Sequence, residues 1–289
     1  MVALENDLRE EFKLNIAVLS GKGGTGKTTI STNLALVMSA NYIDCDVEEP
    51  NGFIFLKPEI VNSKKVNVDY PCINDEKCNN CGDCASVCQF NALAKTKKNV
   101  LLFEKLCHSC GACEIVCKTD ALHYKKRPIG VIEEGILNNI NCKRGILNIG
   151  EPMAVPIIRE LLKNIKEGIN IIDCSPGTSC NVVSSLQYVD LALLVTEPTE
   201  FGLHDLKMAV ELVKKFNIPM AIIINKEVSQ DSIVHNYCIQ EKIPIVGSLP
   251  YSRDIAKEYS SGNMLVNNKK YKKIFDNIAT KVKEGYLWN

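Results

Sequence analysis

The sequence lacks three features that would assign it to a special class of protein. Its 34 Lys and Arg balance its 34 Asp and Glu, so there is no net charge to favour a broad nucleic-acid-binding surface. No apolar run approaches the roughly 18 residues that suggest a membrane span. Residues 1–13 are charged and lack the apolar core of a signal peptide. We therefore expect a cytoplasmic protein that binds no nucleic acid and has no membrane span.

Cysteine, in contrast, is abundant. The 289-residue chain contains 14 cysteines, and eight of them lie between Cys78 and Cys117. In a reducing cytoplasm, clustered cysteines favour metal binding over disulfides. The remaining composition, 46% hydrophobic and 24% charged, is ordinary for a soluble globular protein of one large domain or two.

A glycine-rich stretch, residues 20–29, follows an apolar run that predicts a buried strand and precedes a predicted helix. It fits the pattern G-x-x-x-x-G-K-[ST], in which backbone N–H groups cradle phosphates, Lys27 reaches the β- and γ-phosphates, and Thr28 binds Mg²⁺. We therefore predict an ATP and Mg²⁺ site. Its expected contacts are Gly21, Gly23, Gly24, Thr25, Gly26, Lys27, Thr28 and Thr29.

Strands and helices are expected to alternate on both sides of the cysteine-rich region. This rhythm predicts an α/β fold with a mostly parallel sheet, helices on both faces, and ligands at the carboxyl ends of the strands. The expected strands are 14–19, 42–46, 169–174, 191–196, 220–224 and 244–247, and the expected helices are 30–40, 155–166, 179–188, 203–216, 231–240 and 269–283. The polar residues at the strand ends are Asp44, Asp46, Asp173, Thr196, Glu197 and Asn225.

The cysteine-rich region interrupts this rhythm. We expect a discontinuous P-loop ATPase domain over 14–65 and 127–289, an inserted domain over 66–126, and a polar lead-in over 1–13. The insertion contains an internal repeat, in which CGDCASVCQFNAL is followed by CGACEIVCKTDAL. The ligand spacing C-x-x-C-x-x-C-x-x-x-C occurs in both halves. A pair of zinc knuckles is the alternative, but zinc rarely needs this spacing twice.

This spacing resembles that of the two-cluster bacterial ferredoxins, which implies an α+β ferredoxin-like domain with two 4Fe–4S clusters. In that family the fourth cysteine of each run ligates the other cluster. By resemblance, cluster 1 is held by Cys78, Cys81, Cys84 and Cys117, and cluster 2 by Cys107, Cys110, Cys113 and Cys88. The usual proline after the fourth cysteine is replaced by Gln89 and Lys118, which removes no ligand.

The phosphate loop contains a second lysine, Lys22, in GKGGTGKT. This lysine resembles that of the MinD/ParA superfamily, which includes the nitrogenase iron protein and the Mrp-type iron–sulfur carriers. In that family it reaches the nucleotide of a partner subunit, so the resemblance implies a homodimer that forms on ATP binding. Lys22 and Lys27 would then neutralise charge that develops on the phosphates.

Three further motifs resemble the same superfamily. The sequence Asp44-Cys45-Asp46 matches its Asp-x-Asp motif, which implies that Asp46, supported by Asp44, positions the attacking water. The sequence 173–178 resembles its switch motif Asp-x-Pro-Pro-Gly-Thr, with Ser175 in place of the first proline. This resemblance implies that Asp173 contacts Mg²⁺ through water and that the Gly177 N–H senses the γ-phosphate. The resemblance further implies two contacts to adenine, from Asn225 and Pro250.

A third cluster is a further hypothesis. Cys180 lies seven residues after Asp173, and the nitrogenase iron protein has a ligand cysteine at that offset. Cys142 would be the upstream partner, so that two subunits would share one bridging cluster. The alternative is that both cysteines are packed residues of the fold.

Three functions remain open from the sequence. The first is an ATPase that gates electron transfer through two 4Fe–4S clusters to an unknown redox partner. The second is an ATP-dependent iron–sulfur assembly or carrier protein that hands a cluster to an acceptor. The third is a non-redox positioning ATPase with structural clusters.

Overall fold

A computed structural model describes residues 13–285 of the chain. The polar lead-in expected over 1–13 lies outside these residues except for Lys13, which begins the first strand. A nine-stranded sheet forms the body, in the order β11-β10-β9-β1-β8-β2-β7-β6-β3. The central strands are β1 (Lys13–Leu19), β2 (Asn41–Asp44), β7 (Ile140–Leu147), β8 (Gly168–Asp173), β9 (Leu191–Thr196), β10 (Met220–Glu227) and β11 (Ile245–Pro250).

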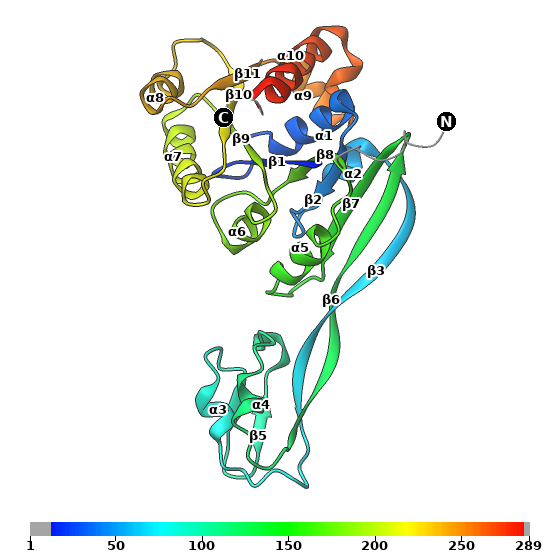
Figure 1. The fold of residues 1–289 in the computed structure, drawn as a ribbon, viewed down its shortest axis with the longest axis vertical. Coiled ribbons are helices and arrows are strands. Elements are labelled where there is room, and N and C mark those ends of the chain that lie inside the picture. Colours follow the sequence, from blue (N-terminus) through cyan, green and yellow to red (C-terminus); the bar gives the residue numbers. More distant parts are fainter. Residues whose placement is uncertain (1–12, 286–289) are drawn as a thin grey trace, which may run out of the picture.

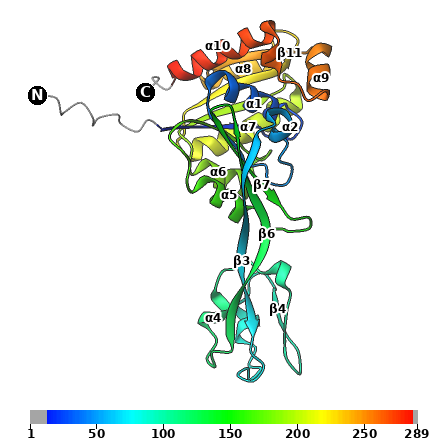
Figure 2. The same ribbon diagram turned by 90° about the vertical axis from the view of Figure 1, so that its right-hand side faces the viewer.

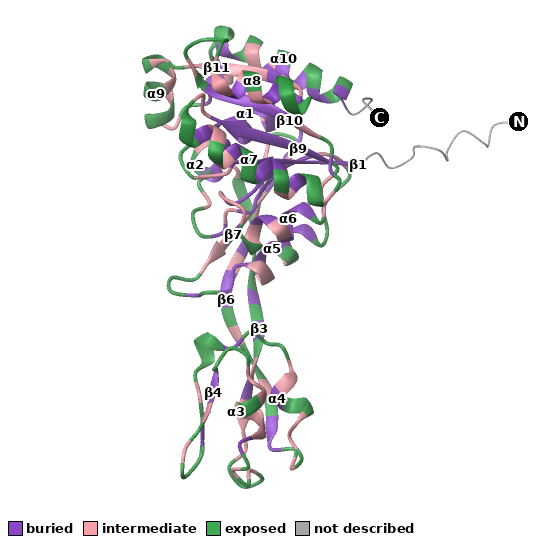
Figure 3. Ribbon diagram, turned by 90° about the vertical axis from the view of Figure 1, so that its left-hand side faces the viewer, coloured by how far each residue is buried: buried purple, intermediate pink, exposed green. Residues whose placement is uncertain are grey.

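All neighbouring strands from β11 to β7 pair in parallel. The apolar runs in this part of the sequence explain the arrangement, because a parallel strand covered on both faces needs apolar side chains in both directions. In β9, for example, every residue of LALLVT is buried. Figure 3 shows this buried centre. The predicted fold, a mostly parallel sheet with helices on both faces, is confirmed.

Helices cover the two faces of the sheet and form two cores (Figure 1). One core receives α5 (Val155–Leu162), α6 (Cys180–Leu186), α7 (Glu200–Lys215) and α8 (Ile233–Glu241). The other core is covered by α1 (Lys27–Met38), α2 (Gly52–Leu56) and α10 (Lys269–Gly285). The helix α9 (Arg253–Ser260) and the short η2 (Leu265–Asn267) pack against the same core.

Three strands on one side of the sheet, β7 and the two beyond it, were not expected from the sequence. β6 (Leu122–Leu137) pairs antiparallel with β7, and β3 (Glu59–Ile73) pairs antiparallel with β6. Together β3 and β6 extend beyond the sheet as a two-stranded ribbon (Figure 2). The first seven residues of β3, EIVNSKK, are all exposed, so they lack the apolar alternation by which a strand is predicted.

The ribbon carries residues 74–121 at its far end, away from the body (Figure 1). This tip has a small core of its own, formed by Leu93, Val100, Cys113 and Leu122. Its elements are α3 (Asp83–Val87), β4 (Leu93–Lys95), β5 (Val100–Leu102), η1 (Glu104–Leu106) and α4 (Ala112–Ile115). Across residues 13–285, no helix is long and apolar enough to cross a membrane.

Candidate functional site

The phosphate loop connects β1 to α1 and depends on glycine for its shape. Gly24 and Gly26 have φ angles of 80° and 90°, in the left-handed region that favours glycine. A Cβ atom on Gly26 would lie 2.1 Å from Nδ2 of Asn225. Gly26 also begins α1 as its N-cap, so the loop presents a helix N-terminus, where backbone N–H groups bind phosphate.

An open hollow of about 1390 Å³ lies in front of this loop. Its lining includes most of the predicted nucleotide contacts, from both lysines of the loop to Asp46, Asn225 and Pro250. Ten lining residues were not predicted as nucleotide contacts: Ser20 belongs to the glycine-rich stretch, Pro176 to the switch motif, and the other eight to no recognised motif. The ten are Ser20, Glu49, Asn51, Pro176, Lys226, Tyr251, Ser252, Ile255, Ala256 and Tyr259.

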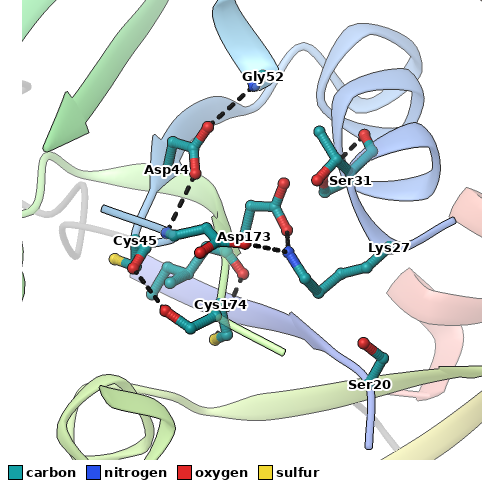
Figure 4. A network of polar contacts seen from close by, with 12 residues as sticks. Ser20, Lys27, Ser31, Asp44, Cys45, Gly52, Asp173 and Cys174 are labelled. Atoms are coloured by element: carbon teal, nitrogen blue, oxygen red, sulfur yellow. Dashed lines mark hydrogen bonds and ion pairs between the residues drawn. The ribbon is translucent and has the colours of Figure 1, made fainter. Parts of the chain in front are cut away.

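Behind the hollow, Lys27 forms a buried ion pair with Asp173 (Figure 4). Lys27 Nζ donates to Asp173 Oδ1 and lies 3.9 Å from Asp46 Oδ2. Although burial opposes the charged form of Lys27, attraction to Asp173 raises the lysine pKa above its ordinary value. The ammonium group is therefore held at the base of the phosphate loop in the charged form that binds phosphate.

The two acids of the Asp-x-Asp motif have different surroundings. Asp44 is 1% exposed, and its carboxylate accepts hydrogen bonds from Gly52 N at 3.0 Å and Asp46 N at 3.1 Å. Burial, together with repulsion from Asp173, raises the pKa of Asp44 to about 8. Burial also raises the pKa of Asp46, to about 6. Of the two acids only Asp46 lines the hollow, whereas Asp44 shapes the loop behind it.

Two predicted nucleotide contacts are engaged within the protein. The Gly177 N–H donates to the carbonyl of Ser20 at 2.8 Å, so in this structure it is not free to sense a phosphate. Asn225 Nδ2 donates to the carbonyl of Thr25 at 2.8 Å, and its Oδ1 accepts from Lys226 N at 2.9 Å. Asn225 therefore braces the phosphate loop here, although it still borders the hollow.

The eight cysteines of the repeat are gathered into two sets at the tip. The first set of thiols lines one small hollow, and the other set lines a second. The last cysteine of each run is brought to the cysteines of the other run, as the ferredoxin resemblance implies. The first set is Cys78, Cys81, Cys84 and Cys117, and the second is Cys88, Cys107, Cys110 and Cys113.

Several groups approach the sulfur atoms of these sets. Ala92 N donates to Cys88 Sγ at 3.3 Å, and the hydroxyl of Tyr124 lies 3.3 Å from Cys113 Sγ. The rings of Phe90 and His108 stack with centroids 3.9 Å apart beside the second set. Within the described chain, no three His, Cys, Asp or Glu side chains are grouped as ligands of one metal ion. A cubane differs, because its thiolates bind separate irons around the cluster.

Cys142 and Cys180 are not brought together. Cys142 lies on β7 at 0% exposure, in the core beneath α1 and α2, and burial raises its pKa to about 12. Cys180 is exposed at the start of α6, a helix that packs on the opposite face of the sheet. A ligand shared between subunits has to reach the surface, and Cys142 does not reach it in this structure.

The chain is similar to one protein-family model and to several proteins of known sequence. Residues 16–266 match the CobQ/CobB/MinD/ParA nucleotide binding domain. The uncharacterized protein MJ0579 of Methanocaldococcus jannaschii is 34% identical over 91% of this chain and 96% of its own length. An iron-sulfur cluster carrier protein of Pyrococcus horikoshii is 26% identical over 76% of this chain and 65% of its own length.

The fold also matches a solved structure. The septum site-determining protein MinD of Pyrococcus horikoshii, complexed with Mg-ADP, superposes with a TM-score of 0.58. The match covers 94% of this chain and 96% of that chain at 18% sequence identity. The likeness therefore concerns the fold.

Proposed function

Because this chain belongs to the CobQ/CobB/MinD/ParA nucleotide-binding family, we propose that it is an ATPase whose nucleotide cycle controls two 4Fe–4S clusters held at the end of the β3–β6 ribbon. The observation that carries the proposal is the gathering of eight thiols into two hollows of four. Four thiolates per hollow are the ligand set of a 4Fe–4S cluster.

The ATPase part rests on the residues around the open hollow. Lys27, at the end of the phosphate loop, would exchange Asp173 for the β- and γ-phosphates of ATP. The N-terminus of α1 would supply N–H donors to the same phosphates. Mg²⁺, bound by Thr28 and through water by Asp173, would neutralise charge on the phosphates. Asp46, the acid of the Asp-x-Asp motif that lines the hollow, would orient the attacking water. Hydrolysis would then proceed by positioning and charge stabilisation rather than by covalent chemistry.

We also propose that ATP joins two copies of the chain. Lys22 lines the mouth of the hollow, where the family resemblance places a lysine that reaches the partner's nucleotide. The expected result is a dimer with a non-hydrolysable ATP analogue and a monomer with ADP, measured by size-exclusion chromatography with light scattering. Lys22→Ala should stay monomeric with both nucleotides. A wild-type chain that remains monomeric with the analogue would contradict the dimer.

The second candidate is an iron–sulfur carrier, favoured by the carrier protein of Pyrococcus horikoshii among the relatives. A carrier releases its cluster to an acceptor, whereas an electron-transfer protein retains it. The two functions therefore differ in the iron that remains bound after ATP hydrolysis. Retention of all iron in the presence of an apo-ferredoxin acceptor supports gated electron transfer, and transfer of iron to that acceptor supports the carrier.

The test of the clusters is anaerobic purification, followed by iron and sulfide analysis and EPR with and without ATP. We expect two coupled reduced 4Fe–4S signals that change with nucleotide. Cys117→Ser should remove one cluster's signal, whereas the matched control Cys72→Ser, a ribbon cysteine that lines neither hollow, should retain both. Zinc in place of iron, or equal iron in the two variants, would overturn the assignment.

A further inference from the structure

A buried tyrosine lies at the centre of the ATPase site although no motif predicts it. Tyr42 is on β2, the strand that leads into the Asp-x-Asp motif, and its side chain is 0% exposed. A buried phenol hydroxyl needs a hydrogen-bond partner, and a residue that served packing alone would be apolar at this place in the sheet. The hydrogen-bond partner of Tyr42 is Asp173, the acid that the family resemblance assigns to Mg²⁺.

The hydroxyl of Tyr42 donates to Oδ2 of Asp173 at 2.9 Å. The other oxygen of the same carboxylate, Oδ1, accepts from Lys27. Asp173 is itself fully buried, so its two oxygens are held from two directions by two elements, β2 and α1. The carboxylate has a fixed orientation in the nucleotide-free chain.

Phosphate binding would remove one of these two partners. Once Lys27 turns to the phosphates, Oδ1 of Asp173 loses its donor and becomes available to a water on Mg²⁺. Oδ2 keeps its bond to Tyr42. We propose that Tyr42 is a positioning residue of the ATPase site, whose hydroxyl holds Asp173 in its metal-facing orientation after Lys27 has left. This inference rests on the proposed ATPase function.

The surroundings of Tyr42 keep the hydroxyl in place. A Cβ atom at Gly52 would lie only 2.0 Å from the Tyr42 oxygen, so the chain passes the hydroxyl as closely as glycine allows. The second carboxylate within reach, Oδ2 of Asp44, is farther at 3.4 Å and already accepts from Gly52 N. Because a phenol has one proton to donate, the shorter contact gives that proton to Asp173.

The experiment compares Tyr42→Phe with the wild-type chain. The dissociation constant of a non-hydrolysable ATP analogue is measured by equilibrium titration, once with Mg²⁺ and once with EDTA. The gain in affinity that Mg²⁺ gives should fall by about tenfold in the variant, as expected for the loss of a hydrogen bond to a charged group. Binding in EDTA should be unchanged, which shows in the same sample that the variant is folded.

Tyr237→Phe is the matched control, because Tyr237 is a half-buried tyrosine of α8 that packs in the core across the sheet. It should retain the full effect of Mg²⁺. A Tyr42→Phe chain with the wild-type Mg²⁺ effect, or with equal losses in Mg²⁺ and EDTA, would overturn the role of Tyr42. A wild-type chain that binds no nucleotide would instead overturn the proposed ATPase function and this inference with it.

Discussion

At the scale of single residues, the proposed nucleotide site is organised around a buried ion pair, which a phosphate bound to Lys27 would have to break. Lys27 is 5% exposed and Asp173 is 0% exposed, so each charge has been removed from water and depends on the other. A phosphate that takes Lys27 therefore competes with Asp173. In the nucleotide-free chain, the Lys27 ammonium group is paired with the Asp173 carboxylate.

The first prediction concerns this pair. Lys27→Ala should lose nucleotide binding and lower the free energy of unfolding of the nucleotide-free chain by roughly 3–5 kcal/mol, because it leaves the Asp173 charge buried with Tyr42 as its remaining donor. The double variant Lys27→Ala/Asp173→Asn should recover part of that loss, since no buried charge is left. Urea unfolding measures both. A double variant less stable than Lys27→Ala would contradict the prediction.

The second prediction concerns pH. The pKa of Asp44 rises from its ordinary 3.8 to about 8 in the folded chain, so the folded state binds a proton that the unfolded state has released. This contribution to stability is complete below pH 3.8 and is lost as the pH rises through about 8. The melting temperature of the nucleotide-free chain should therefore fall between pH 5 and pH 9, and Asp44→Asn should flatten that decline. A melting temperature that rises over this range in the wild type, or an equally steep decline in Asp44→Asn, would contradict the assignment.

At the scale of elements, the start of α1 shows how the loop and a distant strand depend on each other. Gly26→Ala should lower the free energy of unfolding by about 1–3 kcal/mol, because alanine is strained at a φ of 90° and its Cβ would meet Asn225 near the end of β10. Gly23→Ala is the control, since nothing lies within 4 Å of its Cβ. Equal melting temperatures for the two variants would refute this dependence.

The ribbon is fastened to the body by a partly buried ion pair. Arg127 of β6 makes two hydrogen bonds to Glu151, in the loop before α5. Glu151→Ala should lower the free energy of unfolding by roughly 1–3 kcal/mol because it leaves the partly buried arginine without its carboxylate partner. Lys64→Ala, which breaks the exposed Lys64–Glu160 pair between the same ribbon and α5, should change it by less than about 1 kcal/mol. Chemical denaturation distinguishes the two, and similar losses would contradict the difference in burial.

The elements that could be predicted from the sequence are those whose patterns are local. The phosphate loop, the acids at the ends of β2 and β8, and the apolar strands are each recognised within a short window. The ribbon was missed because the exposed half of β3 has no apolar alternation, and its strand partner lies across the whole tip. Tyr42 was missed because it looks like an ordinary strand residue, and its role exists only through Asp173 on another strand.

At the scale of the whole molecule, the body and the tip differ in how much they bury. The body has two extensive cores, whereas the tip core contains four buried side chains. A core this small rarely stabilises a fold without metal or cross-links. We therefore predict that iron chelation speeds amide hydrogen exchange in residues 74–121 and leaves exchange in β1 and β9 unchanged, as measured by mass spectrometry. Equal protection of the tip with and without iron would contradict this.

The ribbon also allows the tip to be separated from the body. Ile73 at the end of β3 faces Leu122 at the start of β6 in register, so the chain leaves for the tip and returns at neighbouring positions. A two-residue hairpin turn can join strands that face each other in this way. Residues 74–121 can therefore be replaced by a short turn without moving the strands β3 and β6 that join them to the body.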